Sequence, residues 1–206
     1  MTDGPRRIVA DGYDAISRHY RGDDDAPPLY SEWIAELQAR LPDAAKVLDL
    51  GCGCGVPVAR ALADAGHDVT GVDVSPVQIE RARDLVPQAT FHVADLTDIA
   101  FEPGSFDAVV CLYAIIHVPL EEHAALLGRV ARWLRPGGWL LLVTGETEWT
   151  GTEDDWLGGG APMWWSHPDR ATSRRWLTDA GFEIGDERRI PEGDGAHALF
   201  WARRPR

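Results

Sequence analysis

The sequence has few cysteines, no long apolar segment and little positive charge, and each absence excludes a class of protein. Its three cysteines, Cys52, Cys54 and Cys111, are too few to build a disulfide framework. No apolar run reaches the length of a membrane span, and the first thirty residues lack the apolar stretch of a secretory signal. We therefore expect a cytoplasmic protein that has no membrane partner.

Acidic residues outnumber basic ones by 33 to 20, which gives a formal net charge of -13 and a pI near 4.8. The basic residues are scattered among the acids. Such a charge repels a phosphate backbone, so we expect no DNA or RNA partner. The 206 residues are 45% apolar and 26% charged, as in an ordinary globular protein, and predict a single domain. The oligomeric state stays open.

Short apolar runs alternate with amphipathic segments from residue 46 onward. The runs at 46–50, 67–74, 89–95, 106–114 and 139–144 predict strands. The segments between them predict helices, one of which starts at the N-cap and first-turn pair Ser75 and Pro76 and another of which covers 121–134 before Pro136-Gly137-Gly138. A later helix closes at Gly181 before a sixth strand, and 197–204 predict the last strand. Repeated βα units of this kind predict an α/β fold with a parallel sheet covered by helices.

Two regions lie outside this alternation. Residues 1–41 predict an N-terminal cap of two helices, the first of which carries Tyr13 and Tyr20. Residues 145–170 hold four of the nine tryptophans and a run of three glycines, and predict a lid over a substrate. Within the single domain, 46–144 then form the cofactor-binding core and 171–206 a C-terminal helix with the final strands.

The turn that follows the first predicted strand is rich in glycine. Gly51, Gly53 and Gly55 alternate with Cys52 and Cys54. A strand-to-helix turn of this kind exposes backbone N–H groups to a polar ligand. Val56 stands where dinucleotide-binding turns have their third glycine, and the Lys-Ser/Thr of a P-loop is missing. The two cysteines lack the further Cys or His partners of a zinc site, so we expect their side chains to be small fillers of the turn and no metal to bind.

Three aspartates follow three successive predicted strands. Asp49 precedes the glycine turn, where it would repel a pyrophosphate but accept from an ammonium group. Asp73 is placed to accept both hydroxyls of a ribose, and Asp95 to accept an exocyclic adenine amine. Each acid alone has an ordinary alternative as a helix cap or solvated turn. Together they predict a site for an adenosine that bears an amino acid rather than a phosphate.

Five motifs in order carry a resemblance to a known family: VLDLGCGCG, GVDVSPVQIERAR, HVADLTDIAF, FDAVVCLYAIIHV and LRPGGWLLLV. Between residues 46 and 143 the chain resembles the class I S-adenosylmethionine-dependent methyltransferases, particularly those that act on small molecules. The resemblance implies a Rossmann-like, doubly wound sheet of seven mostly parallel strands with an antiparallel last strand, an N-terminal helical lid and a Trp-rich insertion after strand five. It also implies S-adenosyl-L-methionine as cofactor and S-adenosyl-L-homocysteine as product.

The resemblance further implies a set of cofactor-binding residues. Asp49, Gly51 and Gly53 would surround the methionine part, together with the neighbouring Cys52. Asp73 would hold the ribose, Val74 would flank the adenine, and Leu112 would also bind the cofactor. Asp95 and the backbone of Leu96 would read the adenine edge. The N-terminal helix with Tyr13 and Tyr20 is similar to helices that close over the cofactor in the family.

Methyl transfer from a sulfonium is an in-line displacement, so a protein contributes chiefly by positioning the reactants and excluding water. A base is needed only when the acceptor must lose a proton. His117 follows strand four and is our base candidate, with the alternative that it hydrogen-bonds backbone and shapes the cofactor wall. His167 is a second candidate, with the alternative that it caps the helix after Pro168.

The four tryptophans of the insertion predict an aromatic wall for a flat or cationic acceptor, with glycines 158–160 as a hinge. They are Trp149, Trp156, Trp164 and Trp165. The alternative is that a lid of this length needs large apolar groups in order to pack. Acidic residues in the same stretch would favour an amine acceptor if they pointed inward, and otherwise form a solvated face.

Three functional hypotheses follow. The first is a methyltransferase that modifies O, N or S of a small, aromatic or heterocyclic metabolite. The second is a regulatory module that binds the cofactor without turnover. The third, a nicotinamide-dependent oxidoreductase, is disfavoured by Val56 and by the charge of Asp49.

Overall fold

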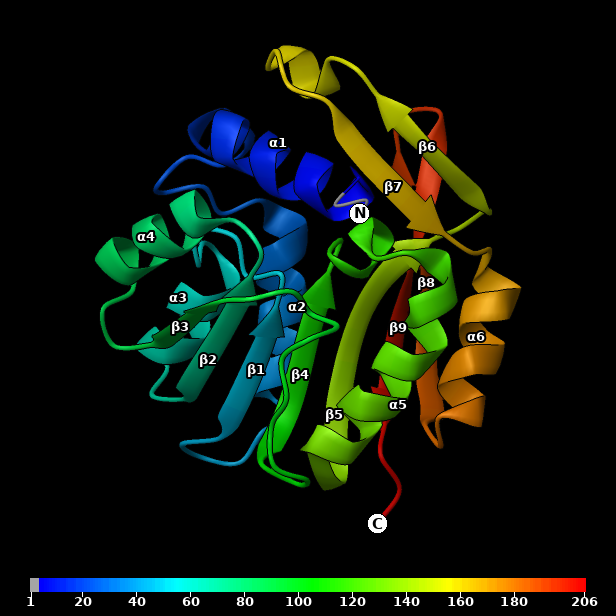
Figure 1. Cartoon of the computed structure of the whole chain (residues 1–206). Coiled ribbons are helices and arrows are strands. Elements are labelled where there is room, and N and C mark those ends of the chain that lie inside the picture. The colour runs from blue at the N-terminus through cyan, green and yellow to red at the C-terminus, as the bar shows by residue number, and fades with distance from the viewer. Residues whose placement is uncertain (1–3) are drawn as a thin grey trace.

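The computed structural model describes residues 4–206, and a sheet of seven strands forms its centre (Figure 1). The strands are β1 (Lys46–Leu50), β2 (Asp68–Asp73), β3 (Thr90–Val93), β4 (Phe106–Leu112), β5 (Leu134–Gly145), β8 (Glu183–Glu192) and β9 (Gly195–Arg203). Their order is β3-β2-β1-β4-β5-β9-β8. The first five are parallel, and β9 lies antiparallel between β5 and β8. This confirms the predicted Rossmann-like sheet and its antiparallel last strand.

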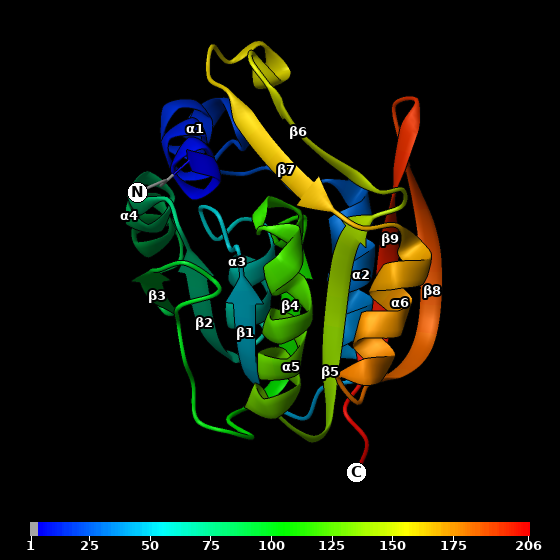
Figure 2. The ribbon, with the colours of Figure 1, turned by 45° about the vertical axis from the view of Figure 1, so that its right-hand side comes forward.

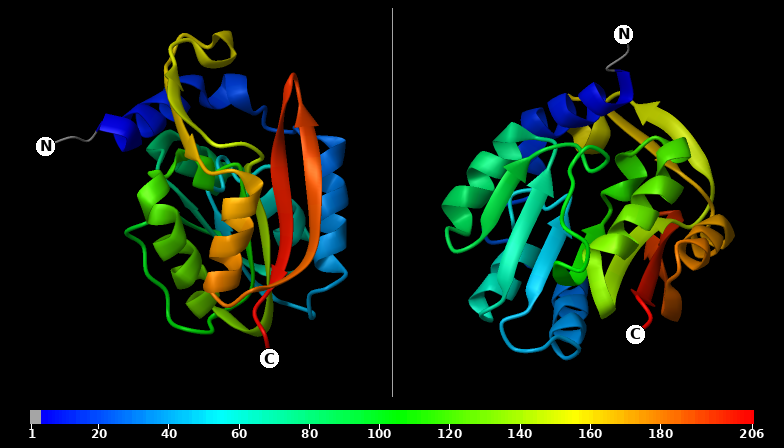
Figure 3. Two further views of the ribbon diagram at one scale, coloured as in Figure 1. Left: turned by 90° about the vertical axis from the view of Figure 1, so that its right-hand side faces the viewer. Right: turned by 60° about the horizontal axis from the view of Figure 1, so that its bottom comes forward.

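Helices cover both faces of this sheet, so two apolar cores form (Figures 2 and 3). On one face pack α2 (Pro28–Gln38), α3 (Val58–Asp64) and α4 (Pro76–Leu85). On the other face pack α5 (His123–Trp133) and α6 (Arg170–Asp179). Successive side chains of each strand point to opposite faces, so Val47 joins one core and Leu48 the other. Burial on both faces is why these strands read as continuous apolar runs.

Local signals explain several helix ends. At the start of α4, the hydroxyl of Ser75 accepts from the backbone N–H of Gln78 at 3.0 Å, as the Ser-Pro pair predicts. After α6, Gly181 has a φ of +92°, a conformation that glycine adopts without steric cost.

The fifth strand differs from its prediction. Two short 3₁₀ turns, η1 (Ile115–His117) and η2 (Leu120–Glu122), precede α5, which ends at Trp133. β5 then begins at Leu134 and includes Pro136-Gly137-Gly138, whereas the sequence predicts a strand from Trp139. Leu134 is fully buried and pairs with Phe106, and the register between β4 and β5 shifts after that pair. The Pro-Gly-Gly stretch therefore forms an irregularity within the strand.

The Trp-rich insertion is a β-hairpin that stands apart from the main sheet. β6 (Trp149–Glu153) and β7 (Met163–His167) pair antiparallel, and η3 (Trp156–Gly158) and the three glycines form its tip. Figures 1 and 2 show the hairpin beside α1 (Gly4–Tyr20) at the carboxyl ends of the parallel strands. That it serves as a substrate lid stays a prediction.

Helix α1 crosses the carboxyl ends of β1, β2 and β4 and is fixed to the start of α4. Asp14 accepts from the backbone N–H of Val77 at 3.2 Å, and the Ser17 hydroxyl donates to Gln78 at 2.8 Å. Residues 1–41, of which 1–3 lie outside the described residues, hold α1 and α2. Because α2 packs on one face of the sheet and α1 lies at the strand ends, a common cap of residues 1–41 stays a prediction. Among residues 4–206, no helix has both the length and the apolarity needed to cross a bilayer.

Candidate functional site

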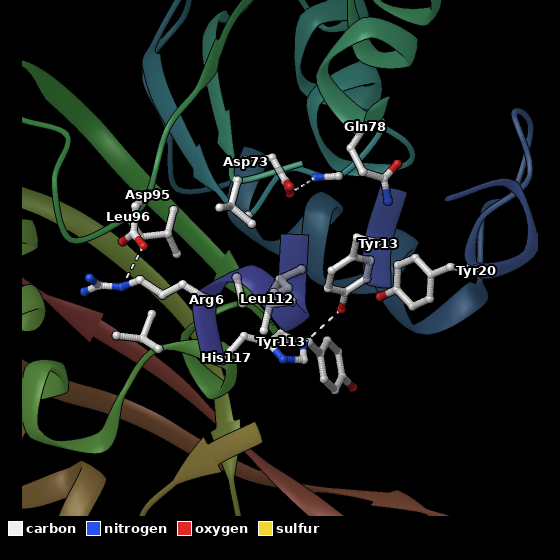
Figure 4. A pocket seen from close by; sticks show the side chains of 16 residues that line it. Arg6, Tyr13, Tyr20, Asp73, Gln78, Asp95, Leu96, Leu112, Tyr113 and His117 are labelled. Atoms are coloured by element: carbon white, nitrogen blue, oxygen red, sulfur yellow. Dashed lines mark hydrogen bonds and ion pairs between the residues drawn. The ribbon is translucent and has the colours of Figure 1, made fainter. Parts of the chain in front are cut away.

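A central cavity lies between α1 and the carboxyl ends of the parallel strands (Figure 4). It brings together nine of the predicted cofactor residues: Tyr13, Tyr20, Gly51, Gly53, Asp73, Val74, Asp95, Leu96 and Leu112. A smaller neighbouring cavity, which we call the glycine-turn cavity, holds the other two, Asp49 and Cys52. Since the residues come from α1 and from the carboxyl ends of β1, β2, β3 and β4, the fold itself assembles this site.

The glycine turn requires its glycines. Gly51 and Gly53 have φ values of +73° and +53°. A Cβ on Gly51 would overlap the Cβ of Ala114, which follows β4. The backbone N–H groups of Gly51 and Cys52 both donate to the carbonyl of Val72, at 2.7 and 3.0 Å, which fixes the turn against β2.

Cys52 contributes its backbone to this turn and its side chain to the core. Its side chain is buried in the core between the sheet and the α2–α4 layer, close to Gly71. Burial, followed by the charge of Asp49, raises the pKa of the Cys52 thiol well above its usual value, so the thiol stays protonated and inert.

Asp73 organises the turn from the end of β2. Its two carboxylate oxygens accept from the backbone N–H groups of Gly53 and Ser75, both at 2.9 Å. Burial nevertheless raises the pKa of Asp73 to about 6, because these hydrogen bonds offset only part of the desolvation. The carboxylate thus lines the central cavity and is pre-oriented by the turn.

Asp49 has a buried carboxylate oxygen without a partner. Its side chain is 3% exposed, and Oδ2 makes no hydrogen bond. Burial, with a smaller contribution from the charge of Asp73, raises the pKa of Asp49 to about 7. An orphaned buried carboxylate is costly unless a cation or donor joins it. The arrangement therefore fits a ligand with an ammonium group next to the glycine turn.

Arg21 lines the same glycine-turn cavity as Asp49, and sequence reasoning missed it. Its guanidinium lies over the rings of Tyr20 and Tyr30, 5.3 and 5.1 Å from their centroids. A cation and an orphaned carboxylate in one cavity are complementary to the two charges of an amino acid. Arg21 follows α1 in a polar loop, where no motif distinguishes it from a solvated residue.

Asp95 is held by the protein on both oxygens. Oδ1 accepts from the backbone N–H and the hydroxyl of Thr97, both at 2.7 Å. Oδ2 forms an ion pair with Arg6 of α1 at 2.9 Å (Figure 4). Arg6 also contacts Glu122 at 2.6 Å. From the sequence we expected this carboxylate to be free to accept from an adenine amine. The difference arises because α1 brings a guanidinium across the chain to the end of β3.

His117 uses both ring nitrogens in contacts with the protein. Nδ1 lies 2.7 Å from the carbonyl of Trp164, and Nε2 lies 3.0 Å from the hydroxyl of Tyr13. A carbonyl only accepts, so Nδ1 carries the hydrogen and Nε2 accepts from Tyr13. Burial lowers the pKa of His117 to about 4, so the ring is neutral at neutral pH. The ring lines both the central cavity and the next one, so it forms part of the wall between them.

A larger outer cavity adjoins the central one. It is formed by segments that follow β4 and β5, by the hairpin and by the tip of the β8–β9 ribbon. Tyr13, Tyr20, Tyr113 and His117 line both cavities and thus form the wall between them. Tyr113 has a φ of +61°, a strained value for a residue with a side chain, of the kind that concentrates at functional sites.

Three of the four predicted tryptophans line the outer cavity, namely Trp149, Trp156 and Trp165. Trp164 does not, and we correct that prediction: successive residues of β7 point to opposite faces, and the Trp164 side chain packs against the core while its carbonyl binds His117. Sequence reasoning missed Tyr30, Tyr113 and the contact of His197 Nε2 with the Glu192 carboxylate at 2.9 Å, all at this cavity.

His167 ends β7 and also lines the outer cavity. It is 8% exposed, Nδ1 makes no hydrogen bond, and burial lowers its pKa. The alternative of a helix cap is wrong, because Asp169 caps α6 by accepting from the backbone N–H of Thr172 at 2.7 Å.

Comparisons with known proteins agree with this geometry. Residues 47–138 match a family described as "Methyltransferase domain". A ubiquinone biosynthesis O-methyltransferase of Xanthomonas campestris pv. campestris is 38% identical over 122 residues, which cover 57% of this chain and 49% of the relative. A 2-methyl-6-phytyl-1,4-hydroquinone methyltransferase of Synechocystis sp. is 36% identical over 117 residues, 55% of this chain and 35% of the relative. The chain thus spans about half or less of the length of these curated relatives.

Among solved structures, the magnesium protoporphyrin IX methyltransferase of Synechocystis PCC 6803 with bound S-adenosylhomocysteine has a TM-score of 0.74 and 25% identity, over 97% of this chain and 99% of the other. The chain is thus similar to the class I S-adenosylmethionine-dependent methyltransferases over residues 47–138 and in its fold, and the cofactor of that family is S-adenosyl-L-methionine.

Proposed function

We propose that this protein transfers a methyl group from S-adenosylmethionine to O, N or S of a small aromatic or heterocyclic metabolite held in the outer cavity. The observation that carries the proposal is the buried, partnerless carboxylate of Asp49 beside the glycine turn. It fits the ammonium group of the cofactor, and Arg21 in the same cavity fits the cofactor carboxylate. A cytoplasmic location and the absence of a nucleic-acid partner stay predictions of the sequence.

The remaining cofactor contacts follow from the central cavity. Asp73 accepts the ribose hydroxyls with a carboxylate that Gly53 and Ser75 already orient. Val74, Leu96 and Leu112 supply the apolar walls of the adenosine site. Asp95, engaged by Arg6 and Thr97, sits at the adenine edge, so an adenine amine shares this carboxylate with Arg6 or displaces it.

The bound cofactor supplies an electrophilic methyl group on a sulfonium. The protein's own contribution is to orient the acceptor and to exclude water. Aromatic rings from α1, the hairpin and the end of β4 surround the outer cavity, among them Trp156, which lies 5.3 Å from Tyr20 and 5.6 Å from Trp165 between ring centroids. Flat apolar faces of this kind favour a planar acceptor over an aliphatic one.

The first test of this function is calorimetry with S-adenosylmethionine, S-adenosylhomocysteine and NADH, followed by transfer of an isotopically labelled methyl group to a panel of phenols, heterocyclic amines and thiols. We expect micromolar binding of S-adenosylmethionine and S-adenosylhomocysteine and no binding of NADH. We also expect the labelled methyl group to appear in at least one planar acceptor. Binding without transfer to any acceptor would favour the regulatory alternative. Absence of binding by a folded protein would refute the cofactor assignment.

Cofactor affinity should depend on pH through Asp49. Its pKa is raised to about 7 in the free protein, whereas an ammonium ligand needs the ionised form. Protonation therefore weakens binding as the pH falls through 7, and we expect affinity to be about tenfold lower at pH 6 than at pH 8. The stability of the free protein depends on pH in the opposite direction. Because folding raises the pKa of Asp49, the group stabilises the folded state at low pH, and this contribution is lost as the pH rises through 7.

The pH dependence of cofactor binding can be checked by calorimetry in two buffers with different ionisation enthalpies, which gives the number of protons released on binding. The Asp49→Asn variant should bind more weakly and lose the pH dependence between 6 and 8 that Asp49 causes. A proton count equal to that of the wild type in this variant would show that another group titrates.

His117 should act by position rather than by charge. Its pKa of about 4 and its two hydrogen bonds indicate that it holds Tyr13 and the hairpin at the wall between the cavities. We expect His117→Ala to lower methyl transfer by about tenfold or more, the order of a lost buried hydrogen bond with its partner left unpaired. Cofactor affinity should stay nearly intact, and the pH profile of the wild-type rate should show no titration of His117 near 6.5.

A rate profile that does titrate near 6.5 in the wild type and not in His117→Ala would instead assign the ring as a general base. If cofactor affinity and rate fall together, His117 belongs to the cofactor site. His123→Ala provides a matched control, since that histidine is also buried and bonded to a backbone carbonyl, of Val118 at 2.9 Å, but lines neither cavity.

A further inference from the structure

Tyr20 lies where the three cavities described above meet. It lines the glycine-turn cavity with Asp49 and Arg21, the central cavity with Asp73, and the outer cavity with the hairpin tryptophans. It is the last residue of α1, so the docking of α1 on α4 fixes its position.

The Tyr20 ring belongs to a cluster of aromatic rings at this junction. Tyr13 meets it edge to face with centroids 5.3 Å apart, and Trp156 lies tilted at 5.3 Å. Tyr113 lines the central and outer cavities nearby. Burial raises the pKa of Tyr13 and of Tyr20, so both rings are neutral phenols at neutral pH.

The chemistry of the cofactor indicates which of its groups would lie at this junction. The sulfonium joins the amino-acid part to the ribose, and its methyl group must face the acceptor. If Asp49 and Arg21 hold the amino-acid part and Asp73 the ribose, the sulfonium belongs where the glycine-turn and central cavities meet, on the side of the outer cavity. Tyr20 marks that place, because it lines all three.

A sulfonium carries a permanent positive charge, and the thioether that remains after methyl transfer is neutral. The faces of aromatic rings attract cations, and the attraction is stronger where the ring and the cation are desolvated. We propose that Tyr20, supported by Tyr13 and Tyr113, forms an aromatic site for the sulfonium charge, so that the protein binds S-adenosylmethionine more tightly than S-adenosylhomocysteine. The proposal rests on the proposed function and adds to it a preference for the charged cofactor over its product.

The positive charge of Arg21 also acts on the sulfonium site. Its guanidinium lies 5.3 Å from the Tyr20 centroid and would repel a second cation. The carboxylate of the cofactor offsets that charge when it pairs with Arg21. Both the sulfonium ligand and the thioether carry this carboxylate, so the comparison between them isolates the charge on sulfur.

The test is calorimetry of both ligands with the full chain. We expect the wild type to bind S-adenosylmethionine about fivefold more tightly than S-adenosylhomocysteine, which corresponds to about 1 kcal/mol. Tyr20→Phe keeps the aromatic face and should keep the ratio, whereas Tyr20→Leu should bring it close to one. Trp149→Leu is the matched control, because Trp149 lines the outer cavity but not the other two, and its ratio should equal that of the wild type.

The outcomes separate this inference from the proposed function. Equal affinities in the wild type, or an unchanged ratio in Tyr20→Leu, would overturn the aromatic site and leave methyl transfer intact. Failure of the wild type to bind either ligand would overturn both. An equal loss of the ratio in Trp149→Leu would show that the effect comes from general packing around the outer cavity, and would also overturn the role of Tyr20.

Discussion

Replacement of Asp73 by alanine should weaken the binding of S-adenosylmethionine by about ten- to hundredfold. A hydrogen bond that involves a charged group contributes about 1.5–3 kcal/mol, and this range gives the expected change in Kd. The carboxylate lies at the end of β2, lines the central cavity and is oriented by two backbone N–H groups. Calorimetry at a fixed pH above 7 measures the effect with both Asp49 and Asp73 ionised.

The same substitution removes two hydrogen bonds from the glycine turn, so a control must separate ligand contact from turn structure. Asp73→Asn retains side-chain oxygen for one of the two N–H groups and keeps the volume, but loses the charge. We expect it to bind the cofactor more weakly than the wild type while unfolding at nearly the same denaturant concentration. Unchanged affinity in Asp73→Ala would refute the assignment of Asp73 to the ribose.

Replacement of Gly51 by alanine should have the largest effect on stability. The residue has a φ of +73°, which costs an L-residue about 1–2 kcal/mol, and the added Cβ would overlap the Cβ of Ala114. Overpacking of this kind adds about 1–3 kcal/mol. We therefore expect a loss of about 2–5 kcal/mol in the free energy of unfolding, measured by denaturant titration, and a loss of detectable cofactor binding.

Two matched variants divide this effect into its causes. Gly66 has a φ of +87° and open space around the position of its Cβ, so Gly66→Ala should show the backbone strain alone. In the double variant Gly51→Ala with Ala114→Gly, the steric overlap is removed and only the strain at residue 51 remains. If the double variant is no more stable than Gly51→Ala, the close approach of β4 to the glycine turn does not determine the effect.

The fold and much of the cofactor site follow from local features of the sequence. Alternation of apolar runs and amphipathic segments is set by burial on both faces of a parallel sheet, and it predicted the strands within a few residues. The acids at the ends of the first three strands lie at one edge of the sheet because parallel strands share their direction. The exception is β5, where the Pro-Gly-Gly stretch lies inside the strand, because the buried Leu134 already pairs with β4.

The details of the site depend on contacts between distant segments, which no local pattern encodes. Arg6 reaches Asp95 only because α1 docks on α4 and crosses the sheet, and this contact occupies a carboxylate that the sequence left free. The partners of His117 come from α1 and the hairpin, so its tautomer and its lowered pKa could not be predicted from its place after β4. The sequence did not show which residues of β7 share a face, so it could not predict that Trp164 points away from the outer cavity.

The Rossmann-like sheet, its glycine turn and its acidic strand ends could be predicted from the sequence, because they depend on local periodicity and on strand direction. The buried Asp49 oxygen without a partner, Arg21 in the same cavity and Tyr20 at the meeting point of the three cavities arise only in the folded chain. Burial and charge pairing arise when segments far apart in the chain pack together, and these two properties set the pKa values and the ligand preference of the site.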